Sequence, residues 1–289
     1  MSEKVQADDG FDDNPLPREI VPGVFWLGAC FGGRNVYKGT VLHSYNSVYL
    51  VVGDDACAIV EGGHPANFPY VEQQLEDLLA RGLPPVKYIF PTHQEVPHSG
   101  GLGRFLQRFP DAVACGHMAE YHLVFPQYED RFREMEIGES VELGGTSIDV
   151  LEAPFRDYIY TRWFFDSRRK VLFSGDGFAY SHYHGAGHCG KSAEETPELA
   201  LPEMTALYGE KAFWWTQFVD IEPYITRLEW LLDDIGAEVL APTHGLPILD
   251  MPKTLPELIK GMRLMPKEDP DRPAFGKHEV RPNVSVLGF

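Results

Sequence analysis

Apolar residues in the first part of the chain come in short runs that end at glycine or aspartate. The runs "GVFWLGAC", "NSVYLVV" and "ACAIVEGG", from about residue 20 to 62, are rich in β-branched and aromatic residues, which is typical of strands. The stretch "VVGDDACAIV" predicts a hairpin with its aspartates in the turn. In "NFPYVEQQLEDLLARGL" the apolar positions recur at helical spacing as far as Gly82, which predicts an amphipathic helix.

The alternation of strand and helix patterns continues to about residue 245. "VKYIF" and "AVACG" predict strands on either side of a short helix in "GGLGRFLQRFP". Hairpins follow in "SVELGGTSIDVLEA" and "YTRWFFDSRRKVLFSGD", then helices around residues 198–208 and 219–235, then the strand and loop of "AEVLAPTHG". Interleaved strands and helices predict a layered α/β domain with helices covering its sheets. We expect an acidic arm over residues 1–19 and a single domain over residues 20–289.

Three predicted strands end in side chains that can bind a metal ion. "VKYIFPTHQ" and "AEVLAPTHG" both contain an apolar strand followed by Pro-Thr-His, which delivers His93 and His244 to similar places. "KVLFSGDG" delivers Asp176 to a third strand end. Because α/β folds bind ligands at the carboxyl ends of their strands, we expect these three side chains to lie close together.

The stretch "HQEVPH" adds His93, Glu95 and His98 to this group. Histidines five positions apart do not share one face of a helix, and Pro97 is not tolerated in a helix interior. We therefore expect a loop that brings the three side chains to one point, with Ser99 capping the next helix. A polar loop with incidental histidines has the same local pattern, and it is Asp176 and His244 that favour a metal site.

Composition narrows the range of partners and compartments. The net charge of −18 disfavours nucleic acid and anionic membranes, which bind basic surfaces. No apolar run approaches the roughly 20 residues of a membrane span, and the N-terminal stretch lacks the basic and apolar regions of a secretory signal. The cysteines form no C-x-x-C pair, so we expect free thiols of a cytoplasmic protein and no iron–sulfur or structural zinc cluster. They are Cys30, Cys57, Cys115 and Cys189.

The order "THQEVPHSGG", "FSGDGF", "APTHG" resembles the metallo-β-lactamase superfamily, which implies a four-layer αββα sandwich. The glutamate at the second ligand position is similar to the H-x-E-x-D-H motif of flavodiiron proteins and their stand-alone oxygen-binding relatives. The likeness runs from about residue 20 to 250 and implies two iron ions, with Asp176 as the bridging ligand. We expect no flavin-binding domain, because no segment of that length follows His244. The implied metal ligands are His93, Glu95, His98, Asp176 and His244.

Two positions depart from the family pattern. Pro97 stands where the motif has its aspartate, and Pro154, in "LEAPFRDY", falls where we place the family's third histidine. Proline cannot orient a metal-bound hydroxide, which counts against hydrolysis. The prediction is a diiron protein that binds or reduces dioxygen or another small oxidant such as nitric oxide, or that oxidises an organic substrate. A separate electron-donor protein would serve it.

Two alternatives stay open at the level of sequence. One is a zinc hydrolase of an ester, lactone or thioester, and the other is a non-enzymatic metal-binding sensor.

Other residues have two interpretations each. His64 is either a substitute ligand or a surface histidine, and Arg156 with Asp157 either lines the pocket or forms a salt bridge. The histidines of "YSHYHGAGHCG" form either a lid over the site or a solvated loop; they are His182, His184 and His188. The aromatic residues of "AFWWTQF" favour core or interface over a substrate wall, and a homodimer remains open; they are Trp214, Trp215 and Phe218.

Overall fold

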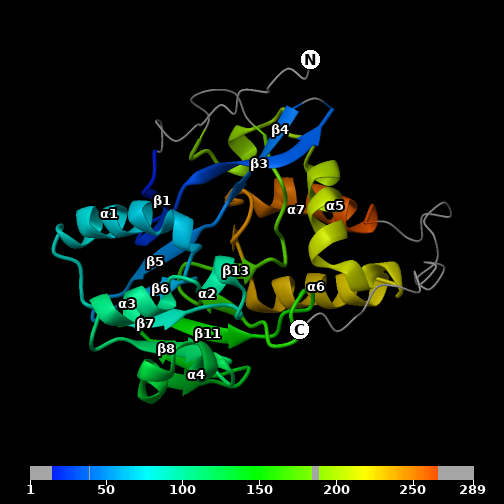
Figure 1. Cartoon of the computed structure of the whole chain (residues 1–289). Helices are drawn as coiled ribbons and strands as arrows, with labels where there is room; N and C mark the ends of the chain where they lie inside the picture. The colour runs from blue at the N-terminus through cyan, green and yellow to red at the C-terminus, as the bar shows by residue number, and fades with distance from the viewer. Residues whose placement is uncertain (1–14, 39, 184–188, 266–289) are drawn as a thin grey trace, which may run out of the picture.

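Two β-sheets, one of them seven-stranded and the other five-stranded, form the centre of the computed structural model (Figure 1). The structure describes residues 15–38, 40–183 and 189–265. The seven-stranded sheet has the order β1 (Arg18–Val21), β2 (Val24–Leu27), β5 (Val48–Val52), β6 (Cys57–Val60), β7 (Val86–Phe90), β8 (Val113–Gly116) and β9 (Phe132–Glu134). The five-stranded sheet has the order β10 (Ser140–Glu142), β11 (Ser147–Leu151), β12 (Trp163–Asp166), β13 (Val171–Gly175) and β14 (Val239–Pro242). A separate ribbon pairs β3 (Cys30–Tyr37) with β4 (Thr40–Tyr45).

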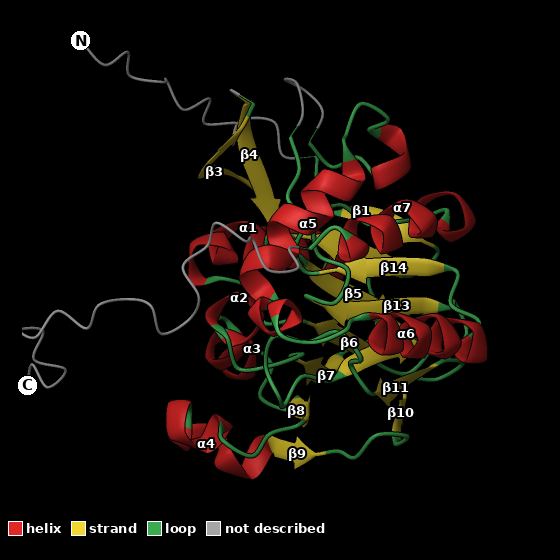
Figure 2. Cartoon of the chain, turned by 90° about the vertical axis from the view of Figure 1, so that its right-hand side faces the viewer, coloured by secondary structure: helices red, strands yellow, loops and turns green. Residues whose placement is uncertain are grey.

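Helices cover the outer faces of both sheets, and Figure 2 shows α1 and α3 on the side opposite α6 and α7. The helices are α1 (Phe68–Leu79), α2 (Val96–Ser99), α3 (Leu102–Arg108), α4 (Tyr121–Val124), α5 (Leu201–Ala212), α6 (Glu222–Ile235) and α7 (Met251–Arg263). Short 3₁₀ turns lie at Pro65–Asn67, Pro126–Arg131, Ala193–Glu195 and Trp214–Gln217. The four-layer αββα arrangement expected from the sequence is confirmed.

Strand β5 shows why its sequence is apolar at every position. Leu50 belongs to the cluster that α1 and α3 cover, whereas Tyr49 and Val51 belong to the cluster that lies between the sheets. Successive side chains of a strand point to opposite faces, and both faces of this strand are buried. A continuous apolar run, rather than an alternating one, is the result.

Both sheets place parallel strand ends beside the region of interest. Strands β6, β7, β8 and β9 run parallel to one another, and β13 and β14 run parallel in the other sheet. The residues that follow β7, β13 and β14 include His93, Asp176 and His244, so these side chains lie at strand ends, as the sequence predicted. Residues 15–19 of the predicted N-terminal arm are described, and strand β1 begins at Arg18. No helix in the described ranges has the length and apolarity that crossing a bilayer requires.

Two local predictions about the "HQEVPH" stretch were wrong. Residues Val96–Ser99 form a helical turn instead of a loop, with Glu95 as the N-cap residue and Pro97 in the first turn. Proline is tolerated there because the first N–H groups of a helix have no intrahelical partner. Ser99 does not cap α3; its hydroxyl donates to the carbonyl oxygens of Gln94 and Glu95.

Candidate metal centre

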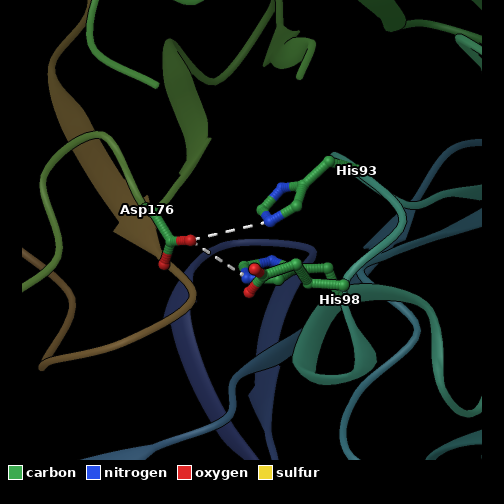
Figure 3. Close-up of side chains that lie close together, drawn as sticks. His93, His98 and Asp176 are labelled. Carbon is green, nitrogen blue, oxygen red and sulfur yellow. Dashed lines mark ion pairs between the residues drawn. The ribbon is translucent and has the colours of Figure 1, made fainter. Parts of the chain in front are cut away.

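His93 and His98 point their Nε2 atoms at one carboxylate, that of Asp176 (Figure 3). Asp176 Oδ2 lies 3.6 Å from Nε2 of His93 and 3.3 Å from Nε2 of His98. All three side chains are buried, and neither Nε2 atom has a hydrogen-bond partner among the described residues. A buried polar atom without a partner lowers the stability of the fold. A cation bound by the two nitrogens would remove this cost.

Asp176 also faces a third histidine. Asp176 follows β13, and His244 follows β14, which is the parallel neighbour of β13. Nε2 of His244 lies 3.5 Å from Oδ1 of Asp176, the oxygen that does not face His93 and His98. The carboxylate of Asp176 thus lies among three histidines, with Oδ2 beside His93 and His98 and Oδ1 beside His244.

Glycine at position 175 makes room for the turn that presents Asp176. Gly175 has φ +55°, and a Cβ atom there would lie 2.9 Å from Oγ1 of Thr92. Only glycine adopts this conformation without strain and leaves that space open. The glycine of "FSGDGF" is therefore tied to the position of the carboxylate.

The second ring nitrogen of each histidine is held by the protein. Nδ1 of His98 lies 3.0 Å from Oε1 of Glu61, and Nδ1 of His93 lies 3.1 Å from Oγ1 of Thr92. Nδ1 of His244 donates to the carbonyl oxygen of Tyr45 at 2.7 Å. Such contacts fix the orientation of an imidazole and leave Nε2 to bind a metal ion.

Two further carboxylates, those of Glu95 and Asp157, lie close to His93. The ligand atoms of Glu95, His93, His98 and Asp176 all lie within 4.8 Å of one another. Oδ2 of Asp157 lies 3.7 Å from Nε2 of His93. The sequence offered Asp157 as a pocket wall or a salt-bridge partner, and the structure confirms both contacts. It placed Pro154 at the third-histidine position and did not single out Asp157 as a possible ligand. The signal available was a carboxylate close to Pro154 in "LEAPFRDY".

Electrostatics reflect the crowding of these groups. Burial, reinforced by Asp176, raises the pKa of Asp157 to about 7. Burial also tends to raise the pKa of Asp176, but His98 outweighs it and the pKa lies well below the ordinary value. Burial and the neighbouring His98 lower the pKa of His93. Each group thus depends on charges a few ångströms away, as at many functional sites.

A cavity of about 460 Å³ opens onto the centre. Its lining is mostly polar, which suits a small hydrophilic ligand more than a large apolar one. Tyr208, from α5, donates its hydroxyl to Oδ1 of Asp176 at 2.6 Å. The lining residues are Ser44, Glu95, Asp157, Asp176, Ser181, Tyr208, Lys211, Ala212 and Trp214.

The remaining predicted residues lie elsewhere or serve other contacts. His64 caps the 3₁₀ turn at Pro65–Asn67, and its Nδ1 accepts from the N–H of Ala66. His182 is buried beside Cys30, and His184 and His188 lie outside the described residues. Among the aromatic residues, Trp214 lines the cavity and Phe218 is exposed.

Comparison with known proteins identifies what this arrangement is similar to. Residues 43–190 match the family model "Metallo-beta-lactamase superfamily". The coenzyme F420H(2) oxidase of Methanothermobacter thermautotrophicus is 30% identical over 244 residues, covering 78% of this chain and 56% of that protein. A nitric oxide reductase of Moorella thermoacetica is 23% identical over 244 residues, covering 80% of this chain and 57% of that protein. The chain thus spans about half the length of the curated relatives that it matches.

A solved structure shares the fold. The rubredoxin oxygen:oxidoreductase of Desulfovibrio gigas superposes with a TM-score of 0.69 at 15% identity, covering 85% of this chain and 60% of that one. At this identity the likeness concerns the fold alone.

Proposed function

Because this chain belongs to the metallo-β-lactamase superfamily, we propose that its metal centre holds two iron ions and reduces a small oxidant, dioxygen or nitric oxide. The observation that carries the proposal is the pair of buried Nε2 atoms of His93 and His98, which face Asp176 and have no hydrogen-bond partner in the part of the chain that the structure describes. The names of the relatives, an F420H(2) oxidase and a nitric oxide reductase, supply the reaction class.

The donor set fits two ions that share Asp176. One set would comprise His93, Glu95 and Asp157 with the bridging Asp176, and the other would comprise His98 and His244 with the same bridge. Asp157 takes the place of the third histidine of the family pattern. Mixed imidazole and carboxylate donors suit iron, whereas a site rich in thiolates would favour softer metals.

When bound, two iron ions supply the redox chemistry that transfers electrons to the oxidant. The protein supplies the surroundings. Glu95, Asp157 and Asp176 give the centre three acidic side chains, whose negative charge offsets that of the cations and favours the ferric state. Tyr208 holds a proton at Oδ1 of Asp176, because burial, reinforced by that carboxylate, keeps the pKa of its phenol well above the ordinary value.

Reduction consumes electrons, so a donor belongs to the proposal. We place a separate electron-donor protein at the mouth of the cavity, where Trp214 is 59% exposed and lines the wall. Phe218 is equally exposed and packs edge-on against Trp214. An exposed aromatic pair beside a redox centre suits docking of either the donor or a second copy of the chain.

Pro97 separates this proposal from a zinc hydrolase. Hydrolytic members of the superfamily use the motif aspartate to orient a hydroxide, and proline has neither a carboxylate nor an N–H. The hydrolase alternative predicts efficient turnover of esters, lactones or thioesters. The presence of Pro97 predicts that such turnover is weak. A screen of those substrates with zinc-loaded protein checks the point directly.

The test of the proposed function is metal analysis combined with oxidant consumption. Protein from iron-supplemented cells should contain iron, and the chemically reduced form should consume dioxygen or nitric oxide in repeated cycles. Zinc-loaded protein is the matched control and should be inert to both. Iron-loaded, reduced protein that consumes neither oxidant would overturn the proposal.

A further inference from the structure

The cavity beside the metal centre is larger than a diatomic oxidant needs. Its volume is about 460 Å³, and since a water molecule takes about 30 Å³ in the liquid, it has room for roughly fifteen waters. Dioxygen and nitric oxide have two atoms each and would occupy a small part of it. Cavities of a few hundred cubic ångströms are the usual size of sites for organic ligands. We propose that the cavity also binds a small organic acid, whose carboxylate pairs with Lys211.

This inference deepens the proposed function and rests on it, because it names the class of organic molecule that shares the cavity with the oxidant. One wall of the cavity is a face of α5. Tyr208, Lys211 and Ala212 line it, and residues three and four positions apart lie on one face of a helix. The hydroxyl of Tyr208 donates to Oδ1 of Asp176 at 2.6 Å, so this face of α5 is turned towards the metal centre.

Lys211 lies further from the metal centre, on the side of the solvent. It follows Tyr208 by three residues, which is about 4.5 Å along the helix axis, and it is exposed. A lining residue that is also exposed lies at the opening of a cavity. The ammonium group can therefore meet a ligand whose other end reaches the metal centre.

The charge of Lys211 suits an anionic ligand. Among the described residues that line the cavity, Lys211 alone is basic. It pairs with no carboxylate in the described ranges, whereas Lys260 on α7 lies 3.6 Å from the carboxylate of Glu257. A lysine ammonium has three hydrogen-bond donors, and a ligand carboxylate would accept from them. The helix dipole also favours a lysine in the last turn of α5, so stability has to be measured beside ligand binding.

The remaining lining residues suit the rest of such a ligand. Ser44, in β4, and Ser181 bring hydroxyl groups to the cavity, and a hydroxyl can donate to or accept from further oxygen atoms of an organic acid. Trp214 is 59% exposed and, with Ala212, offers apolar contact to a short hydrocarbon body or an aromatic ring. A charged end, polar substituents and a compact body match this lining, whereas a long apolar chain does not.

The metal centre favours an anion only when it is loaded. Glu95, Asp157 and Asp176 face the cavity with three carboxylates, which repel an acid while no cation is bound. Two divalent ions carry four positive charges, so the loaded centre is net positive. An organic acid should therefore bind the loaded protein more tightly than the metal-free protein.

Calorimetric titration of zinc-loaded protein tests the proposal. Zinc has the charge of ferrous iron but no redox chemistry, so binding is measured apart from reduction of the oxidant. The probes are 4-hydroxybenzoate and 4-hydroxybenzamide, which have nearly the same shape and differ in charge. We expect the acid to bind roughly tenfold more tightly than the amide, as one charge-assisted hydrogen bond would provide. Binding of the acid to metal-free protein should be weaker.

Variants of Lys211 separate its charge from its place in the helix. Lys211→Gln removes the charge and should abolish the preference for the acid over the amide. Lys211→Arg keeps the charge and should retain the preference. Lys253→Gln, at an exposed position of α7 outside the lining, is the matched control and should bind as the wild type does. Urea unfolding of the same proteins records any loss of the helix-dipole interaction, which would lower stability and leave the preference unchanged.

Three results would each overturn the proposal: equal affinity of the wild type for acid and amide, equal affinity of metal-free and zinc-loaded protein for the acid, or a preference that survives in Lys211→Gln. Oxidant consumption by iron-loaded protein, measured without an organic acid, distinguishes the two proposals. Consumption without any preference for the acid rejects this inference alone. Iron-loaded, reduced protein that consumes neither oxidant rejects the proposed function.

Discussion

Oε1 of Glu61 accepts a hydrogen bond from Oγ1 of Thr243 at 2.6 Å, and the same oxygen accepts one from Oγ1 of Thr92 at 2.7 Å. Thr92 and Thr243 are the threonines of the two Pro-Thr-His segments. One buried carboxylate at the end of β6 thus fastens both segments, and it also lies 3.0 Å from Nδ1 of His98. This relationship gives the repeated Pro-Thr-His pattern a physical reason, since the threonines hold the histidine loops to a common anchor.

We expect Glu61→Gln to weaken iron binding without changing the fold. The amide keeps the size of the side chain, but its NH2 group cannot accept the hydrogen bond that Oε2 accepts from the N–H of Thr92, and the negative charge beside Nδ1 of His98 is lost. Loss of a group that orients metal-binding histidines costs roughly 10–100-fold in metal affinity. Competition of the iron-loaded protein with a coloured chelator measures the effect. Glu134→Gln, which alters a partly exposed carboxylate that pairs with His117, is the control, and equal affinity of the two variants would contradict the anchor role.

Asp157 should behave as a metal ligand. Asp157→Asn removes the charge that lies near His93 and should lower the iron content towards one ion per chain. Asp157→His restores the imidazole of the family pattern and should keep both ions. Elemental analysis of the two variants beside Asp130→Asn, an exposed position, makes the comparison. Full iron content in Asp157→Asn would show that this carboxylate only lines the cavity.

Removing the proposed bridge should have a larger effect than removing a terminal ligand. Asp176 faces three histidines with its two oxygens, so Asp176→Ala should empty both positions. His244→Ala should empty mainly one, because His244 belongs to only one of the two proposed donor sets. Iron stoichiometry and circular dichroism on both variants test this order. Undiminished iron in a well-folded Asp176→Ala protein would refute the bridging assignment.

The parts of the molecule that the sequence predicted are those fixed by local pattern. Apolar runs, turn residues and helical spacing located most strands and the helices α1, α3, α5 and α6, because those signals act over a few neighbouring residues, whereas α7 was not predicted. The strand ends carrying His93, Asp176 and His244 followed from the same pattern. Glu61 could not be found in this way, since its role depends on Thr92 and Thr243, which reach it only in the folded sheet.

The local sequence pattern also could not predict where along a loop a given residue would lie in the folded protein. The choice of Pro154 over Asp157 for the third-ligand place depended on where the loop after β11 turns, which packing against the centre decides. The helical turn at Val96–Ser99 was missed for a related reason. Pro97 was taken as a helix breaker, although proline is compatible with the first turn.

A carboxylate far from the centre gives a pH-dependent prediction. Burial tends to raise the pKa of Glu194, but hydrogen bonds from Thr254 and from the N–H groups of Leu249 and Asp250 outweigh it and lower the pKa. A lowered folded-state pKa stabilises the protein above the unfolded value of about 4.3, and this stabilisation is lost as the pH falls through the folded value. Glu194→Gln should therefore reduce the free energy of unfolding by about 1 kcal/mol at neutral pH.

The difference between Glu194→Gln and the wild type should shrink as the pH drops below about 4. Urea unfolding at several pH values measures it, with Glu203→Gln, an exposed position in α5, as the control. A difference that stays constant with pH would mean that the charge of Glu194 plays no part.

The identity of the second residue in the "HQEVPH" motif should decide which metal the centre takes up. Glu95 offers a carboxylate beside His93, His98 and Asp176, where a hydrolase of this superfamily has an imidazole. A carboxylate is a harder and more anionic donor, which favours iron and its ferric state, while divalent affinity alone favours zinc. Glu95→His should therefore shift the metal content from iron towards zinc when both are supplied in the growth medium. Glu95→Asp keeps the donor type and serves as the control, so its iron-to-zinc ratio should remain near that of the wild type. If Glu95→His and the wild type contain the same ratio, selection must arise from the other carboxylates of the centre, with Asp157 the first to test because it replaces a second imidazole of the family pattern.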